Sequence, residues 1–133
     1  MLHKLLQDGF DEGMDLNCAE TILYGANEAY RLGLDKNALK LAAGFGGGMA
    51  IESVCGALTG CIMVLGRLFV EDRAHQSPEL KEHIKELFRL YGEDMGSIMC
   101  DALKDRYRTE EKKCRDVIEK AARILDKIIE TRS

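Results

Sequence analysis

Cysteine is the residue type with the richest chemistry in this chain of 133 residues, which contains five of them. A cysteine thiolate is a nucleophile, a redox-active group and a soft ligand for zinc or iron–sulfur clusters. A cysteine can equally be a small apolar side chain in the core. The five positions are widely separated along the chain: Cys18, Cys55, Cys61, Cys100 and Cys114.

The spacing of the cysteines excludes several familiar sites. The sequence has no C-x-x-C pair, so it supports neither a thioredoxin-type motif nor a zinc ribbon, and it has no C-x-x-C-H signature for covalent haem. The cysteine runs of ferredoxins are also missing. Catalytic, sensing and metal-ligating thiols remain open, beside the simpler interpretation that the cysteines only pack in the core.

The composition is that of one folded domain. Apolar residues make up 46% of the chain and charged residues 32%, and the net charge is −4 without a basic cluster, so nucleic-acid binding is not expected. No apolar stretch is long enough for a signal peptide or a membrane span. We therefore expect a cytoplasmic protein that does not span a membrane, whose thiols stay reduced and form no disulfide framework.

Apolar residues recur at intervals of three and four almost throughout, and the chain has one proline. Both features favour helices, and we predict a compact all-α bundle of five or six helices in a single domain over residues 1–133. Asn17 with Glu20 has the signature of a capping box, Ser77-Pro78 is a helix start signal, and Thr109 is predicted to cap the last helix. The expected helices cover residues 2–13, 18–31, 36–45, 53–70, 77–103 and 110–131.

Helical phase indicates where four of the cysteines point. Cys18 and Cys55 fall near the starts of helices, where the positive end of the helix dipole stabilises a thiolate. Cys114 lies one turn before the apolar face of the last helix, so it is expected to point inward. Cys61 lies about 120° around the helix from Cys55 and about 9 Å along it. The two should not share one small centre, and we interpret Cys61 as core packing.

Cys100 fits this scheme less simply. In a regular helix over residues 77–103 the apolar stripe would pass nearly opposite to it: Leu80, Ile84, Leu87, Tyr91 and Met95. Either Gly92 and Gly96 change the phase of the helix, or its last turn faces a second surface.

Two glycines beside Cys55 also stand out. Gly56 and Gly60 share one face of the predicted helix, and glycine inside a helix costs about 1 kcal/mol relative to alanine. This pattern indicates a close approach by another backbone or by a cofactor, and a tight helix crossing alone would explain it. Glu52, the lone charge between residues 41 and 66, is either solvated in a loop or a polar partner of the cysteine site. The three histidines lack ligands at chelating spacing and are predicted to lie on the surface: His3, His75 and His83.

Together these residues resemble a known family. Asn17-Cys18-Ala19 precedes a glycine-rich turn at residues 44–48, the segment CGALTG follows at residues 55–60, and two single cysteines come later. From about Leu2 to the last helix, the chain resembles the redox-active protein family named after its C_GCAxxG_C_C pattern. The resemblance implies a redox role for four positions, called here the motif cysteines: Cys18, Cys55, Cys100 and Cys114. It gives a supporting role to Gly56, Ala57 and Gly60.

The cysteine layout is also similar to the cluster-bearing part of split-Soret-type cytochromes, which implies an iron–sulfur centre. The leading hypothesis is therefore an iron–sulfur protein for electron transfer or redox sensing, with the motif cysteines as ligands. One alternative is a metal-free thiol–disulfide protein in which Cys18 or Cys55 is the attacking thiol. Another is a zinc-stapled helical interaction module. We also expect a redox partner protein, and the long uncharged segment raises the hypothesis of a homodimer.

Overall fold

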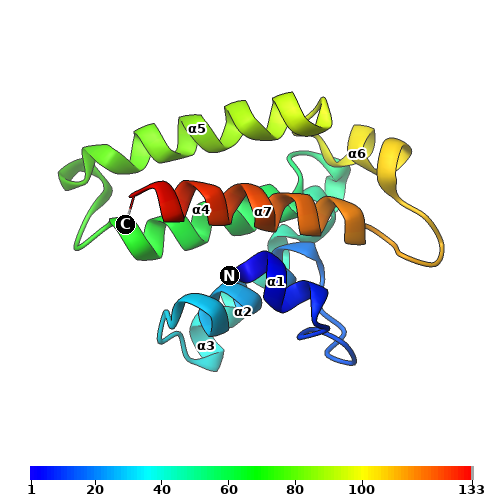
Figure 1. The fold of residues 1–133 in the computed structure, drawn as a ribbon, viewed down its shortest axis with the longest axis horizontal. Helices are drawn as coiled ribbons and strands as arrows, with labels where there is room; N and C mark the ends of the chain where they lie inside the picture. Colours follow the sequence, from blue (N-terminus) through cyan, green and yellow to red (C-terminus); the bar gives the residue numbers. More distant parts are fainter. Residues whose placement is uncertain (133) are drawn as a thin grey trace.

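The computed structural model describes residues 1–132 (Figure 1). Within this range the chain forms seven α-helices, so the all-α prediction is confirmed, with a count above the five or six expected. The helices are α1 (Leu2–Gln7), α2 (Cys18–Tyr30), α3 (Lys36–Leu39), α4 (Gly56–Phe69), α5 (Pro78–Met95), α6 (Cys100–Tyr107) and α7 (Arg115–Arg132). None of the helices in the described range has the length and apolar character needed to cross a membrane.

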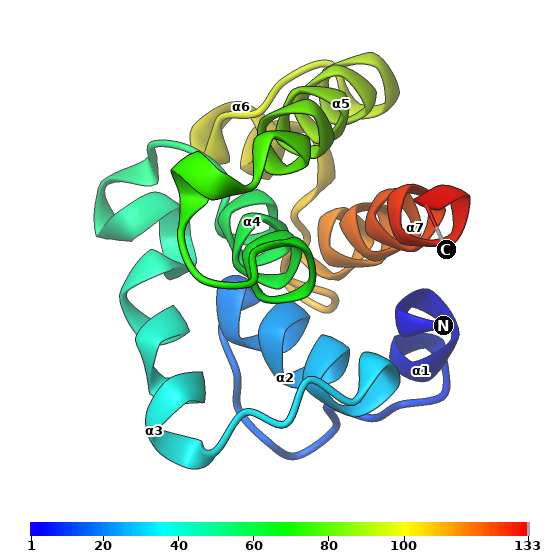
Figure 2. The same ribbon diagram turned by 90° about the vertical axis from the view of Figure 1, so that its left-hand side faces the viewer.

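The helices pack in three layers (Figures 1 and 2). Helices α4 and α7 form the middle layer, α5 covers one side of it, and α1 and α2 cover the other. The side chains between the layers are fully buried, and burial of each large apolar side chain contributes about 1.5–3 kcal/mol. Examples from different helices are Ile22, Leu58, Leu87 and Leu125. Helix α6 lies beside the start of α7 at one end of the molecule (Figure 1).

The predicted helix over residues 77–103 is two helices. Helix α5 ends at Met95 because Gly96 adopts a left-handed conformation with φ of 83°. The guanidinium group of Arg106 then donates a hydrogen bond of 2.8 Å to the Met95 carbonyl, which secures the end of α5. A new helix, α6, begins at Cys100. Because Cys100 lies in α6, the position of the apolar stripe of α5 does not determine where its side chain points. The conflict between Cys100 and that stripe, found in the sequence, is thereby removed.

Other helix boundaries also differ from the prediction: α3 gives way to a 3₁₀-helix over Lys40–Phe45, and α4 begins at Gly56 rather than at residue 53. The two largest differences lie in α1 and α7. Helix α1 ends at Gln7, because the chain turns at Gly9, whose φ is 89°. The last helix begins at Arg115, and the prediction that Thr109 caps it is wrong. Thr109 instead pairs with Lys113 through two backbone hydrogen bonds of 3.2 and 2.8 Å, which close a turn before the helix.

The predicted caps have mixed outcomes. The capping box is confirmed: Asn17 accepts the Glu20 N–H, and the Glu20 side chain accepts the Asn17 N–H. Pro78 occupies the first turn of α5 as predicted, but the Ser77 side chain makes no cap and its hydroxyl donates to the Arg73 carbonyl.

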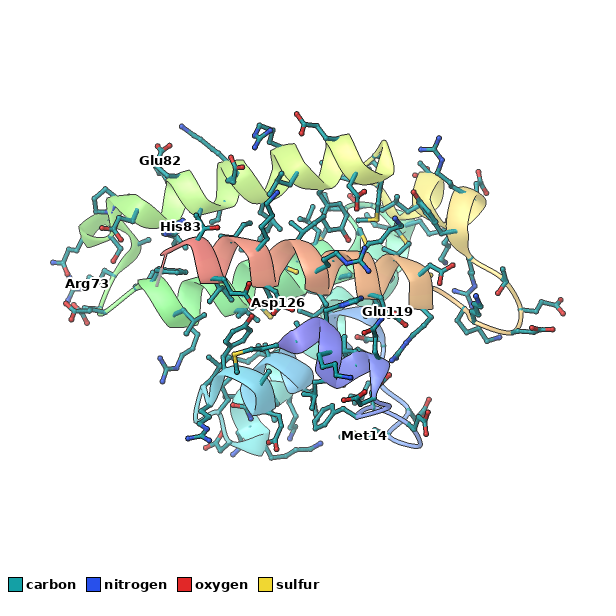
Figure 3. The ribbon with its side chains drawn as sticks, viewed as in Figure 1. Met14, Arg73, Glu82, His83, Glu119 and Asp126 are labelled. Carbon is teal, nitrogen blue, oxygen red and sulfur yellow. The ribbon has the colours of Figure 1, made fainter. Side chains whose placement is uncertain are left out.

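A buried carboxylate fastens the first helix to the last. Asp126 of α7 accepts the N–H groups of Leu2 and His3 at 2.9 and 2.8 Å, and it also accepts the Tyr30 hydroxyl of α2. Figure 3 shows Asp126 on the side of α7 that faces α1. These bonds satisfy N–H groups at the start of α1, which have no partner within the helix.

The surface prediction for the histidines is wrong for His83. Its side chain is 2% exposed, and its ring lies 4.2 Å from the ring of Phe69. Figure 3 shows it on the inner side of α5. His83 lies one turn before the buried Leu87, so it shares the apolar face of its helix. His3 is half-buried, and His75 is exposed as expected.

Candidate functional site

Each motif cysteine stands at the beginning of a helix. Cys18 is the first residue of α2 and Cys100 the first of α6. Cys55 is the N-cap of α4, and the carbonyl of Cys114, just before α7, accepts the N–H of Ile118 at 3.0 Å. The unpaired N–H groups and the positive dipole end at each helix start favour negative charge.

The four helix starts meet at one cavity of about 200 Å³, and all four motif cysteines line it. Cys55 and Cys100 are buried, whereas Cys18 and Cys114 are half-buried. Cys61, the fifth cysteine, is not among the residues that line this cavity. Its side chain is fully buried, with the sulfur 3.8 Å from the carbonyl oxygen of Ala121 in α7, as expected for a core residue.

A short backbone pairing brings Cys55 and Cys100 to the cavity together. The Cys55 N–H donates to the Ile98 carbonyl at 2.8 Å, and the Cys100 N–H donates to the Ser53 carbonyl at 2.6 Å. Gly48 packs on this pairing, and a Cβ there would lie 2.8 Å from the Cβ of Cys100. Helices α4 and α6 therefore start from one antiparallel pair of segments.

The glycines of the CGALTG segment have separate roles. A Cβ at Gly56 would lie 2.5 Å from the Cys18 sulfur, so only glycine leaves room for that thiol. A Cβ at Gly60 would lie 3.0 Å from the Ala19 carbonyl oxygen, so this glycine permits the crossing of α2 and α4. Ala57 is fully buried in the core. Of the two explanations open from the sequence, the tight crossing applies to Gly60, and Gly56 admits a motif cysteine.

The glycine-rich turn supports the start of α2. The Asn17 amide donates to the Ala43 carbonyl at 2.9 Å, and Gly46 lies so close to the Asn17 side chain that a Cβ would overlap with it. Gly47 lines the cavity. Asn17 is therefore both the cap of α2 and the anchor of the turn.

A left-handed stretch follows Gly47. Residues 47–50 all have φ between 62° and 68°, although Met49 and Ala50 are not glycines. Each non-glycine residue in this conformation costs about 1–2 kcal/mol. Glu52 lies two residues beyond this stretch; it is exposed in the loop and forms an ion pair of 3.4 Å with Lys104, a residue that lines the cavity. Glu52 is thus a loop residue with a partner at the rim of the cysteine site.

The charged residues that line the cavity are all basic. Lys104, Arg108 and Lys113 line it, and its lining contains no aspartate, glutamate or histidine among the described residues. One guanidinium nitrogen of Arg108 lies 3.9 Å from the Cys114 sulfur. The whole chain has a net charge of −4, so this local excess of positive charge runs against the overall balance. The cavity is suited to a negatively charged occupant.

Burial sets the protonation of the two innermost thiols. Burial raises the pKa of Cys55, against the lowering effects of the Tyr91 hydroxyl and the backbone amides of Leu58 and Ala57. Burial also raises the pKa of Cys100, with Lys104 acting in the opposite direction. Both thiols therefore keep their protons near neutral pH, and a soft metal would have to displace them. Cys55 does not have the low pKa that suits an attacking thiol.

The cavity is larger than a single ion requires. The described residues include no set of three or more histidine, cysteine, aspartate or glutamate side chains placed to hold a single metal ion. A tetrahedral zinc site needs each sulfur about 2.3 Å from the ion. The cavity of about 200 Å³ far exceeds the roughly 10–15 Å³ that one water molecule needs. The four thiols that line this volume are of the residue type that ligates zinc or an iron–sulfur cluster.

Comparison with known proteins gave one family. The family described as "Putative redox-active protein (C_GCAxxG_C_C)" matches residues 16–128, a range that contains every motif cysteine, all of α2, α4 and α6, and most of α7. No curated protein and no solved structure matched the chain.

Proposed function

The chain belongs to the C_GCAxxG_C_C family of redox-active proteins, as its sequence predicted, and on that premise we propose that it holds an iron–sulfur cluster on the motif cysteines. One observation carries the proposal: four helices begin at these cysteines, and the four starts line one cavity. A bound cluster would accept and release single electrons, so the protein would act in electron transfer or redox sensing.

The electrostatics of the cavity support this function. Thiolates that ligate a metal have lost their protons, so the four cysteines would add negative charge to a partly buried site. Uncompensated buried charge is strongly unfavourable. Here residues at four helix starts line the cavity, together with Lys104, Arg108 and Lys113. These groups offset the charge of the thiolates without a carboxylate in the lining.

The protein's own groups have distinct tasks in this proposal. Cys55 and Cys100 lie deepest and exclude water from their side of the site, because both are buried. Cys18 and Cys114 are half-buried and stand nearer to solvent. An electron would therefore enter or leave most directly on the side of these two cysteines.

Thiol–disulfide exchange is the second candidate, favoured by four thiols lining one cavity. In that reaction the Cys18 thiolate would attack a disulfide of a partner protein, and a second motif cysteine would displace the partner. The partner would be reduced to two thiols while two cysteines of this chain became a disulfide. Cys18 suits the attack better than Cys55, because it is half-buried at the start of a helix of 13 residues. The zinc-stapled alternative would use the same four thiols, with zinc and no sulfide bound.

Anaerobic purification separates the two candidates. The iron–sulfur proposal expects a brown protein with bound iron and acid-labile sulfide, and an electron paramagnetic resonance signal after reduction or oxidation. A colourless protein that takes up neither iron nor sulfide on reconstitution, and that forms a disulfide reversibly, would replace the cluster with thiol exchange.

A further inference from the structure

Tyr91 buries a hydroxyl group beside the cysteine site. The residue lies on the inner face of α5, its side chain is fully buried, and its hydroxyl oxygen is 3.1 Å from the sulfur of Cys55. Its neighbours one turn away on the same face, Leu87 and Met95, are apolar. A phenylalanine would fill the same space without a polar atom, and a buried hydroxyl without a partner costs about 1–3 kcal/mol. The contact between the hydroxyl group and the Cys55 sulfur therefore explains why this position has tyrosine and not phenylalanine.

The direction of this hydrogen bond depends on the proton of Cys55. Either atom can donate while the thiol is protonated. A metal-bound thiolate has no proton, so the hydroxyl must then donate to the sulfur.

Cys55 also has the backbone amides of Ala57 and Leu58 near its sulfur, at the start of α4. The side chain of Tyr91 comes from a different helix, α5, and approaches the same atom. Hydrogen bonds to the sulfur ligands of a cluster are among the features that set its reduction potential. A donor to a ligand sulfur stabilises the more negative, reduced state and so raises the potential.

We propose that Tyr91 is a positioning residue for Cys55, which holds the sulfur at the cavity by its hydrogen bond and raises the potential of the bound group. The effect on the potential rests on the proposed function, whereas the positioning of the Cys55 sulfur concerns only the protein's own atoms.

The test compares two variants of the full-length chain after anaerobic reconstitution with iron and sulfide. Tyr91→Phe removes the hydroxyl beside Cys55. Tyr30→Phe is the matched control, because it also removes a tyrosine hydroxyl that is hydrogen-bonded, in this case to Asp126, and Tyr30 does not line the cavity. Iron content, sulfide content and the midpoint potential are measured for both variants and for the unchanged protein.

We expect Tyr91→Phe to retain its iron and to have a midpoint potential lower by about 59 mV. For a one-electron couple, this decrease favours the oxidised over the reduced state by a factor of about ten. Tyr30→Phe should keep the potential of the unchanged protein. An unaltered potential in Tyr91→Phe, or an equal shift in both variants, would overturn the tuning role. If Tyr91→Phe does not fold, 3-fluorotyrosine is introduced at position 91 instead. Its hydroxyl group is a stronger hydrogen-bond donor than that of tyrosine, so the midpoint potential should rise.

A second measurement needs no cluster. In the reduced, metal-free protein, the infrared S–H stretching band of Cys55 is assigned by its loss in Cys55→Ser. Tyr91→Phe should shift this band, whereas Tyr30→Phe should leave it in place. A shifted band in a protein that binds no iron would refute the proposed function but keep the contact with Tyr91. An unshifted band would refute the positioning role itself.

Discussion

Two backbone hydrogen bonds pair the segment that carries Cys55 with the segment that carries Cys100. The N–H of Cys55 donates to the Ile98 carbonyl at 2.8 Å, and the N–H of Cys100 donates to the Ser53 carbonyl at 2.6 Å. Cys55 and Cys100 are far apart in the sequence, but they lie in two antiparallel segments that pair with each other at the starts of α4 and α6. Changes that disturb either segment should therefore affect the site as a unit.

Gly56 should be essential for the site. A Cβ at this position would lie 2.5 Å from the Cys18 sulfur, so Gly56→Ala should displace that thiol, lower iron content and reduce the melting temperature. Gly66→Ala is the matched control in the same helix, because a Cβ there meets no atom within 4 Å. The control should keep its iron and gain up to about 1 kcal/mol in stability, because alanine is the better helix former. Equal iron content in both variants would contradict the role of Gly56.

Gly96 should control where Cys100 points. Its φ of 83° is strained for alanine, so Gly96→Ala should cost about 1–2 kcal/mol in urea denaturation. The variant should also lose iron, because a continuous α5 would carry Cys100 out of position. Gly92→Ala provides the comparison, since a Cβ there meets no atom within 4 Å. Retention of iron by Gly96→Ala would show that the break after Met95 is not needed for the site.

Lys104 should influence the titration of Cys100. Its charge acts to lower the pKa of that thiol, which burial raises. Lys104→Met should therefore raise the pKa of Cys100 further, and at a fixed pH the metal-free protein should react more slowly with iodoacetamide at this position. Mass spectrometry of the labelled peptide measures the rate at several pH values. Lys81→Met, an exposed change in α5, should leave the rate unaltered.

The homodimer hypothesis can be examined at the uncharged segment. Leu41 and Ile51 are 72% and 77% exposed, which is unusual for large apolar side chains in one short region. If this region joins two copies of the chain, size-exclusion chromatography should give a dimer that Ile51→Lys converts to a monomer. A monomer at high concentration before any substitution would end the hypothesis.

Local signals in the sequence predicted much of the fold. The capping box at Asn17 and the proline of α5 depend on neighbouring residues only, so they could be recognised without the structure. His83 could also have been placed correctly, because it precedes the buried Leu87 by four residues on the same helix face. The prediction treated it by residue type alone.

Other features depend on contacts between distant segments. Gly96 ends α5 whereas Gly92 does not, and the sequence offered both as breaks because each lies in a helical pattern. Thr109 resembled a cap, but its pairing with Lys113 delays the last helix to Arg115. These two errors placed Cys100 and Cys114 inside longer helices. The convergence of four helix starts is therefore a result of the structure.

Whether the four motif cysteines together hold one cluster is tested by the iron and sulfide content of five single variants after identical anaerobic reconstitution. Serine replaces each motif cysteine in turn, and Cys61→Ser is the control, because Cys61 is a buried cysteine outside the cavity lining. We predict that each of the four substitutions in the cavity lowers iron content and melting temperature together, since ligands from distant segments also stabilise the fold. Cys61→Ser should keep its iron and lose only some stability. Loss of iron in Cys61→Ser with retention in Cys55→Ser would contradict the account.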